Sequence, residues 1–581
     1  MPLSCRSMDK AGTLVRIARG EAPADLLLRN AQVFDAFSGS FFEGDVAVAE
    51  GTIVGFGATD ARRTVDLEGA ALVPGFIDAH LHLESSQLTP AEFARAVLPH
   101  GTTAVVADPH EIANVLGLAG IRYLLDASED LPLRAFLMAP SCVPATLLET
   151  AGACLSSRDV ADILTWKRVI GLGEVMNVPG VLAGDSDLRD KLACAKGRPI
   201  DGHAPGLSGP DLWAYLVAGP QSDHECTTLA EAKEKLQAGM HILIREGTTA
   251  RNLVALLPLL TSASGPFVHF STDDRGPETL LSEGHIDDLV RKAIKGGAPP
   301  EVALAAATIH TARAYGLCGL GAIAPGYRAD LIVLSDLVSV RVAQVYASGQ
   351  LVAEAGRCVA ALPAAALPPP AHPMRVDARS VSFRIPLAGG VTRVIGVIPS
   401  QVATEDLRVV PRARDGEVWA DPSRDLLKLA VVERHAGTGN VGLGLVRGFG
   451  LRRGALASTV AHDSHNAILV GTNDEDMRVA LDVLLMAGGG QVVVAEGRVQ
   501  ALLPLPIAGL LSDRPLADVA AAARDLGRAA RTLGCALPDP FMALSFLALP
   551  VIPRLKLTDR GLVDVERFRH VPLFVEADQR G

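Results

Sequence analysis

Between residues 74 and 324, short apolar runs alternate with longer stretches in which apolar and polar residues are mixed. Eight of these runs have the length of buried strands: 76–82, 103–108, 133–139, 169–174, 199–204, 222–225, 241–245 and 267–273. Apolar strands that alternate with helical stretches are typical of a parallel sheet. Eight such units in about 250 residues predict a (β/α)8 barrel of the TIM type, which builds its active site at the carboxyl ends of its strands.

The two segments that flank this barrel follow another pattern, with short β-type runs separated by glycine turns. Such runs occur at 26–28 and 53–56 within residues 1–73, and at 329–334 within residues 325–361. Short strands with regular turn signals are typical of a small sandwich or barrel. We therefore expect the two segments to pair into one β-sandwich domain that the (β/α)8 barrel of residues 74–324 interrupts.

A third domain is expected after residues 362–376, a Pro-rich segment typical of a semi-rigid linker. Residues 377–581 mix expected strands such as 427–432 with expected helices such as 474–486, which indicates an α/β domain. The glycine run from Gly442 to Gly448 lacks the strand, loop, helix and acidic residue of a dinucleotide site. We interpret that run as turns.

Composition and charge restrict the class of partner. The chain has 581 residues, of which 49% are hydrophobic and 20% are charged, so it has the composition of a globular protein with several domains. The net charge of −11 argues against binding to nucleic acid, which requires a basic face. The densest apolar stretch, 541–552, contains Pro550 and is too short to cross a membrane. A small molecule or another protein is therefore the expected partner.

The cysteines indicate a reducing compartment. There are eight, and no two of them form a Cys-x-x-Cys motif, which argues against both a disulfide framework and a thiolate zinc site. The N-terminal segment has basic residues but no apolar core typical of a secretory signal. We expect a cytoplasmic protein, and we expect it to form a homo-oligomer, as a dimer.

His80 and His82 are the first candidates for a chemical role. They stand at the end of an expected strand, where side chains at i and i+2 point to the same face and can share one metal ion. An isolated His-x-His pair is more often an ordinary core or surface feature. Further metal-type residues at the ends of other strands would favour a metal site instead.

Four more residues of this kind occur at the ends of other expected strands: Glu174, His203, His224 and Asp273. In a barrel, all six side chains meet at one mouth although they lie far apart in the sequence. Four imidazoles and two carboxylates exceed the needs of one divalent ion and suit a two-metal site bridged by a carboxylate and a hydroxide.

Several longer sequence motifs, which we call words, carry a family resemblance over nearly the whole chain. They are residues 74–85 (Pro-Gly-Phe-Ile-Asp-Ala-His-Leu-His-Leu-Glu-Ser), 107–115, 173–177, 201–205, 222–225, 271–275 and 461–466 (Ala-His-Asp-Ser-His-Asn). With these words the chain resembles the amidohydrolase superfamily and, within it, the adenine deaminase family. The first word fits the whole superfamily, whereas the later words are more selective.

The resemblance implies a role for each candidate ligand. His80, His82 and Asp273 would hold one ion, His203 and His224 would hold the other, and Glu174 would bridge them. It also implies Mn(II) or Fe(II), while Zn(II) is compatible with the same ligands. The ions would lower the pKa of a bound water, so that a hydroxide is available near neutral pH to attack C6 of adenine.

Hypoxanthine and ammonia would be the products of that attack. Asp273 is the candidate for moving a proton to the leaving ammonia, and Asp108 and His110 are candidates for transferring the ring proton. Either residue of the latter pair could instead bind only backbone. The cytidine-deaminase type of zinc site is excluded because the chain lacks its Pro-Cys-x-x-Cys motif.

Glu84, Asp274 and His465 are the residues that we expect to contact the substrate. His465 belongs to a polar cluster with His462, Asp463 and Asn466, which forms either an ordinary domain interface or a cover over the barrel mouth. Two alternatives to adenine deamination stay open: another amidohydrolase activity, on a cyclic amide or a different aminopurine, and a catalytically silent protein on the same barrel.

Overall fold

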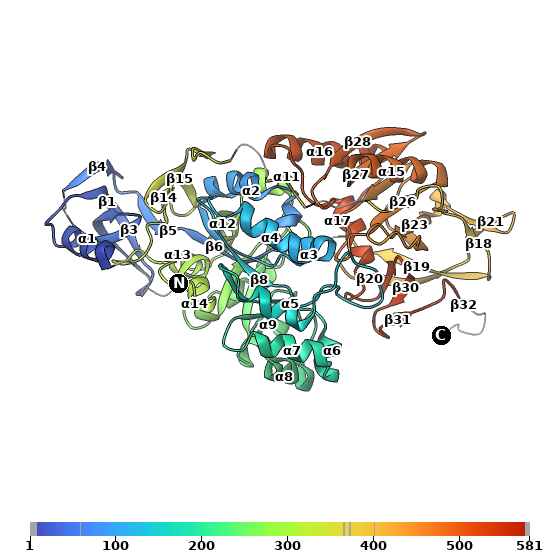
Figure 1. Cartoon of the computed structure of the whole chain (residues 1–581), viewed down its shortest axis with the longest axis horizontal. Coiled ribbons are helices and arrows are strands. Elements are labelled where there is room, and N and C mark those ends of the chain that lie inside the picture. Colours follow the sequence, from blue (N-terminus) through green and yellow to red (C-terminus); the bar gives the residue numbers. More distant parts are fainter. Residues whose placement is uncertain (1–7, 58–59, 364–366, 371–373, 400, 576–581) are drawn as a thin grey trace.

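The computed structural model describes residues 8–57, 60–363, 367–370, 374–399 and 401–575. Part of the expected linker, at 364–366 and 371–373, lies outside the described residues. Three regions follow one another along the long axis of the molecule in Figure 1, with the N-terminal strands at one end and the C-terminal strands at the other. The segment of residues 74–324 lies between them.

The two segments that flank residues 75–330 join in a single nine-stranded sheet. Its hydrogen-bonded order is β17-β16-β15-β14-β5-β1-β2-β3, and β4 pairs with β1. The strands are β1 (Ala24–Asp35), β2 (Ser40–Ala49), β3 (Thr52–Phe56), β4 (Ala61–Asp66), β5 (Ala71–Pro74), β14 (Leu331–Asp336), β15 (Arg341–Ala347), β16 (Gln350–Glu354) and β17 (Arg357–Cys358). The segments meet where β5 runs antiparallel to β14, and the helix α1 (Met8–Ala18) contacts β3.

All eight strands expected between residues 74 and 324 are present, and all their pairings are parallel. Five form the sheet β10-β9-β8-β7-β6 and three form the sheet β11-β12-β13. They are β6 (Phe76–Leu81), β7 (Thr102–Ala107), β8 (Arg134–Ala139), β9 (Val169–Val175), β10 (Ile200–Gly202), β11 (Ser222–Asp223), β12 (His241–Arg245) and β13 (Val268–Ser271). β6 and β7 are buried along their whole length, as parallel strands covered on both faces should be.

Helices separate these strands in the sequence. They are α2 (Pro90–Val97), α3 (His110–Leu116), α4 (Leu118–Ala127), α5 (Ser157–Ile163), α6 (Val178–Ala183), α7 (Ser186–Cys194), α8 (Gly209–Ala218), α9 (Leu229–Gln237), α10 (Leu253–Leu256), α11 (Pro277–Ser282), α12 (Ile286–Lys295), α13 (Pro300–Ala305) and α14 (Thr311–Ala314). Several begin at a capping side chain; Ser156 and Asp159 form a reciprocal capping box at the start of α5.

The two parallel sheets approach each other along both of their edges. On one side, Leu81 forms a parallel bridge with Asp273, which places the end of β6 beside the end of β13. On the other side, the backbone N–H of Gln221 donates to the carbonyl of Ile200 at 2.8 Å, between β10 and β11. The ends of β6 and β13, and the strands β10 and β11, therefore lie beside each other.

The C-terminal region contains a second nine-stranded sheet, in the order β20-β19-β24-β23-β26-β25-β27-β28, with β32 beside β19. Two three-stranded sheets, β18-β22-β21 and β29-β30-β31, accompany it. The strands are β18 (Ile385–Pro386), β19 (Val391–Val397), β20 (Thr404–Val409), β21 (Arg412–Arg414), β22 (Glu417–Trp419), β23 (Leu427–Val432), β24 (Val441–Arg447), β25 (Ala455–Ser458), β26 (Ala467–Gly471), β27 (Gly490–Ala495), β28 (Arg498–Pro504), β29 (Leu555–Thr558), β30 (Gly561–Asp564), β31 (Arg569–His570) and β32 (Phe574–Val575).

Three helices complete this region: α15 (Asp474–Ala487), α16 (Leu516–Thr532) and α17 (Pro540–Ser545). α15 contacts β25, β26 and β27, and α16 contacts β28. α17 lies between the C-terminal sheet and the middle region in Figure 1. Within the described ranges, no helix combines the length and the apolar character that a membrane crossing requires.

The glycine run at 442–448 is not a series of turns, contrary to our interpretation of the sequence. It forms most of β24, which pairs antiparallel with β23 and parallel with β19. A β-carbon on Gly442 would lie 1.8 Å from the carbonyl oxygen of Thr558, so this position needs glycine because the backbone of β29 passes directly over it. The glycines therefore mark a close approach of two backbones.

We expect Gly442→Ala to lower the free energy of unfolding by about 1–3 kcal/mol, because β29 must move away from the added methyl group. Urea denaturation followed by circular dichroism measures the change. Gly390→Ala is the matched control, since no heavy atom of the described residues comes within 4 Å of its β-carbon position. Equal midpoints for the two variants would contradict the packing argument.

Candidate metal centre

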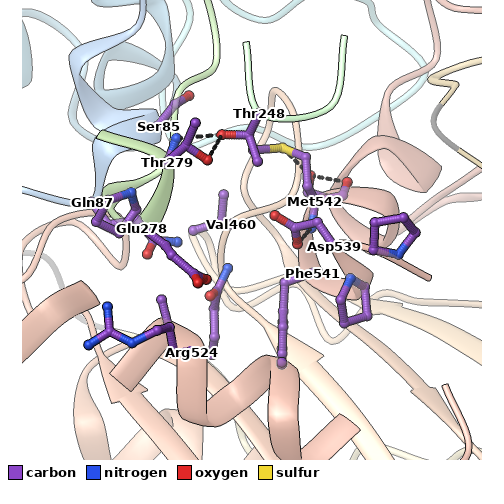
Figure 2. Close-up of a pocket in the computed structure, with 18 of the residues that line it drawn as sticks. Ser85, Gln87, Thr248, Glu278, Thr279, Val460, Arg524, Asp539, Phe541 and Met542 are labelled. Atoms are coloured by element: carbon purple, nitrogen blue, oxygen red, sulfur yellow. Dashed lines mark hydrogen bonds between the residues drawn. The ribbon is translucent and has the colours of Figure 1, made fainter. Parts of the chain in front are cut away.

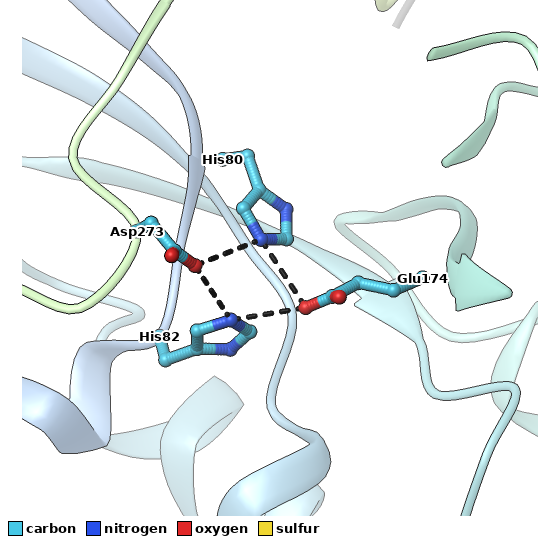
Figure 3. A group of neighbouring side chains, drawn as sticks. All are labelled: His80, His82, Glu174 and Asp273. Atoms are coloured by element: carbon cyan, nitrogen blue, oxygen red, sulfur yellow. Dashed lines mark ion pairs between the residues drawn. The ribbon is translucent and has the colours of Figure 1, made fainter. Parts of the chain in front are cut away.

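Four side chains meet at the carboxyl ends of β6, β9 and β13. The Nε2 atom of His82 lies 3.0 Å from Oε1 of Glu174 and 3.1 Å from Oδ1 of Asp273. The Nε2 atom of His80 lies 3.3 Å and 3.5 Å from the same two oxygens. Figure 3 shows the two imidazoles and the two carboxylates pointing toward one centre. Four ligand-type atoms this close together could hold one metal ion.

A second group shares Glu174 with the first. The Oε2 atom of Glu174 lies 2.8 Å from Nδ1 of His203, at the end of β10, and 3.5 Å from Nε2 of His224, which follows β11. One oxygen of Glu174 thus faces His80 and His82, and the other faces His203 and His224. This is the arrangement in which a single carboxylate can bridge two ions.

The buried polar atoms of this group fit bound cations. All six side chains are buried. Within the part of the chain that the structure describes, neither ring nitrogen of His80 has a hydrogen-bond partner, and its Nε2 is the atom that faces both carboxylates. Such atoms are costly to bury without a partner. Imidazole with carboxylate is a donor set that suits Mn, Fe, Zn and Co.

The electrostatics also favour cations. Burial lowers the pKa of His80, but the carboxylates of Asp273 and Glu174 outweigh it and raise that pKa to about 10. Burial likewise opposes ionisation of Glu174, yet the neighbouring histidines hold the pKa of its carboxyl well below the usual range. The two carboxylates therefore stay ionised, and their negative potential attracts positive charge to the space between the imidazoles.

Arg245 and Glu225 surround the ligands, and the sequence analysis missed both. Arg245 donates to Oδ2 of Asp273 at 3.0 Å and forms a bidentate pair with Glu225. This contact leaves Oδ1 of Asp273 free to face His80 and His82. Glu225 lies within the matched word 222–225, directly after His224, which was the available signal. Partners of this kind orient metal ligands.

Asp108 and His110 lie beside Glu174, as their expected roles require. The Oδ2 atom of Asp108 accepts the backbone N–H of Glu174 at 2.8 Å, and it lies 3.5 Å from Nδ1 of His110. The same nitrogen of His110 is 3.8 Å from Oε1 of Glu174. His110 also lines the cavity above the ligands, whereas Asp108 lies behind it. Of the two, only His110 borders this cavity.

The three expected substrate contacts lie in different places. Asp274 lines the cavity and accepts a hydrogen bond from the Ser85 hydroxyl. Glu84 is buried behind it, where Oε1 accepts the backbone N–H of Ile112 at 2.9 Å. His465 does not line this cavity directly; its Nδ1 accepts the backbone N–H of Ala461, and its Nε2 binds Glu111, which does line the cavity.

His462, rather than His465, reaches the cavity from the C-terminal region. Its Nδ1 lies 2.5 Å from Oε1 of Glu111, a contact between residues 351 positions apart. Asp463 lines the cavity next to it. The sequence analysis quoted Glu111 in the word 107–115 but assigned it no role. The polar cluster 462–466 therefore meets the barrel-side residues directly, through Glu111.

Apolar residues of the C-terminal region cover the ligands. These roof residues are Val402, Phe546, Leu549 and Ile552, and the cavity that they line together with the ligands measures about 30 Å³. Glu225, Arg245 and three of the roof residues also line a neighbouring cavity of about 970 Å³. The space above the ligands therefore adjoins a much larger cavity.

A third cavity, of about 340 Å³, lies between α11 and the helices α16 and α17. Figure 2 shows Glu278 and Thr279 of α11 facing Arg524 of α16 and Asp539 and Phe541 at the start of α17. His462 lines both this cavity and the one above the metal ligands. The ring of His462 stacks on that of Phe546, with the ring centroids 4.6 Å apart, and forms part of the wall between the two cavities.

Comparison with known families matches both halves of the chain. Residues 71–352 match the amidohydrolase family, and residues 401–569 match the adenine deaminase C-terminal domain. An adenine deaminase of Desulfatibacillum aliphaticivorans is 50% identical over 566 residues, which cover 97% of this chain and 99% of that protein. An adenine deaminase of Methanothrix thermoacetophila has the same identity and coverage. A solved β-aspartyl dipeptidase of Fervidobacterium islandicum AW-1 is 18% identical, with a TM-score of 0.44 over 58% of this chain and 99% of that one.

We expect Glu174→Gln to lower the metal content of protein saturated with Mn(II), from about two ions per chain to fewer than one, because the shared carboxylate is lost. Elemental analysis by mass spectrometry measures this. The control is Glu149→Gln: Glu149 is also a buried glutamate, with its pKa raised by burial, but it does not line the cavity above the ligands. Undiminished metal binding in Glu174→Gln would exclude Glu174 as a ligand.

Proposed function

The chain belongs to the adenine deaminase family, and we propose that it hydrolyses adenine at C6 to hypoxanthine and ammonia. The observation that supports a two-metal hydrolysis is the carboxylate of Glu174, whose two oxygens face two separate pairs of histidines. The observation that favours adenine is the near-full-length similarity to adenine deaminases, including the C-terminal domain. The reaction would serve purine salvage or the breakdown of adenine.

We propose that residues 74–324 form one closed (β/α)8 barrel. The bridge between Leu81 and Asp273 and the hydrogen bond between Gln221 and Ile200 support closure of the two parallel sheets at both edges. On this layout, residues 1–73 and 325–361 form one β domain, and residues 377–581 form the C-terminal domain after the linker 362–376. Active sites of such barrels lie at the strand ends that carry the histidines.

His80, His82 and Asp273 would hold one divalent ion, and His203 and His224 would hold the other, with Glu174 bridging. Mn(II) or Fe(II) is the proposed metal, and Zn(II) suits the same ligands. When bound, the two ions lower the pKa of a water toward neutrality and so supply the nucleophile. A bridging Glu needs no added carbon dioxide, unlike a carboxylated Lys in the same position.

The side chains of the site would move two protons during the reaction. Addition of water to adenine leaves OH and NH2 on a tetrahedral C6. His110, whose Nδ1 lies 3.5 Å from Asp108, would deliver a proton to ring N1 and regain one from the attacking water. Asp273 then takes the proton from the OH group and passes it to the NH2 group, which leaves as ammonia. N1 keeps its proton, as hypoxanthine requires. Arg245 fixes Asp273 in position for this transfer.

We expect protein loaded with Mn(II) to release ammonia from adenine at a rate of about 1 s⁻¹ or more, with much slower release from adenosine and no opening of dihydropyrimidines. A coupled ammonia assay, with metal analysis of the same sample, measures it. If the protein binds two ions but does not turn over adenine, the proposed metal centre stands and adenine is excluded as the substrate. Opening of a dihydropyrimidine would favour a cyclic-amide hydrolase.

We expect His110→Gln to lower kcat by roughly 10²- to 10⁴-fold while the metal content stays unchanged, because proton transfer is lost and the metal ligands are kept. Steady-state kinetics with adenine and metal analysis test both parts. His100→Gln is the matched control, since His100 precedes β7 and His110 follows it, at the opposite end of the strand. An unchanged kcat in His110→Gln would remove His110 from the mechanism.

A further inference from the structure

Two buried polar atoms above the metal centre have no hydrogen-bond partner among the described residues: Nε2 of His462 and Oδ2 of Asp463. The two residues are only 3% and 2% exposed, so bulk water does not satisfy these atoms. Both residues line the same cavity as the metal ligands. Because a buried polar atom without a partner is costly, the pair is suited to a polar ligand that enters this cavity.

His462 is held so that its Nε2 atom keeps a fixed position. Its Nδ1 binds Glu111, and its ring stacks on Phe546 with an angle of 15° between the planes. The other oxygen of Glu111 is bound by His465, whose backbone carbonyl accepts a hydrogen bond from the buried Arg434. Rigid support of this kind is typical of residues that bind a ligand specifically.

The cavity has two chemically different sides. The strand ends of the middle region contribute the metal ligands, and the C-terminal region contributes His462, Asp463 and the roof residues. When C6 of adenine faces the metal ligands, the opposite edge of the purine is the one formed by N3 and N9, because N3 lies across the six-membered ring from C6. That edge presents one acceptor, N3, and one donor, N9–H.

We propose that His462 and Asp463 bind this edge, with Asp463 accepting the N9–H and His462 donating from Nε2 to N3. The inference rests on the proposed function and extends it to the choice between free base and nucleoside. Burial lowers the pKa of His462, but Glu111 and Asp274 raise it to about 9, so that both ring nitrogens carry protons at neutral pH. Nε2 then donates while Nδ1 stays on Glu111.

This contact would exclude adenosine for a physical reason. A nucleoside carries its sugar on N9, so it has no N–H for Asp463 and places a bulky group against a buried carboxylate. Sites built to hydrogen-bond one group discriminate strongly against analogues that lack it, because their own polar atoms are left unpaired. The barrel ligands make no such distinction, since both molecules have the same C6 amino group.

The test compares adenine with 9-methyladenine in the metal-loaded wild type and in Asp463→Asn. We expect the substitution to lower kcat/KM for adenine by roughly 10- to 100-fold, and to change the value for 9-methyladenine much less. The preference for adenine should therefore fall at least tenfold, with the metal content unchanged. An unchanged preference in a protein that still deaminates adenine overturns this inference alone. No deamination of adenine by the wild type overturns the proposed function as well.

Two further variants separate binding from folding. His462→Asn keeps an N–H donor near the position of Nδ1, toward Glu111, and removes Nε2; it should raise KM for adenine and for 9-methyladenine alike, because N3 is present in both. Asp559→Asn is the matched control: Asp559 accepts from Thr150 and Asn440 at the same domain interface, away from the cavity. It should lower the melting temperature without changing the preference. A loss of preference in Asp559→Asn equal to that in Asp463→Asn would overturn the assignment.

Discussion

The carboxylate of Glu174 is the contact on which the arrangement of the site depends. A buried carboxylate is unfavourable alone, and here two histidines face each of its oxygens from the ends of β6, β10 and β11. The ends of these strands must therefore lie close together, to which the parallel pairing and the bridge between Leu81 and Asp273 contribute. The ligand set and the strand arrangement thus support each other.

A second constraint is that the C-terminal region contributes to the site. Val402, Phe546, Leu549 and Ile552 line the cavity of about 30 Å³ above the ligands. Charges interact more strongly between buried side chains, such as these ligands, than between side chains in water. The cover is attached to the barrel side by specific polar contacts, of which the bond between Glu111 and His462 lies nearest the centre. The site is thus complete only when both regions are in place.

The sequence predicts the strands of the middle region well because apolar runs bounded by turns depend on local pattern. It also predicts the six ligand-type residues, since each stands at the end of such a run. Glu111 could not be assigned because its partners, His462 and His465, lie about 350 residues later in the chain. The run 442–448 was misinterpreted for the same reason: only the backbone of β29, more than a hundred residues later, explains why glycine occupies a strand there.

The two regions divide the chemistry between them. Side chains at the strand ends can activate water for many substrates, because they act on a carbon and its leaving group and do not contact the rest of the molecule. Selection of one substrate needs further polar atoms that contact the rest of that molecule. His462 and Asp463 supply such atoms from a separate domain, and Glu111 fixes their position relative to His110 and the metal ligands. A domain that carries both the cover and the selective contacts can therefore couple closure of the site to recognition of the correct substrate.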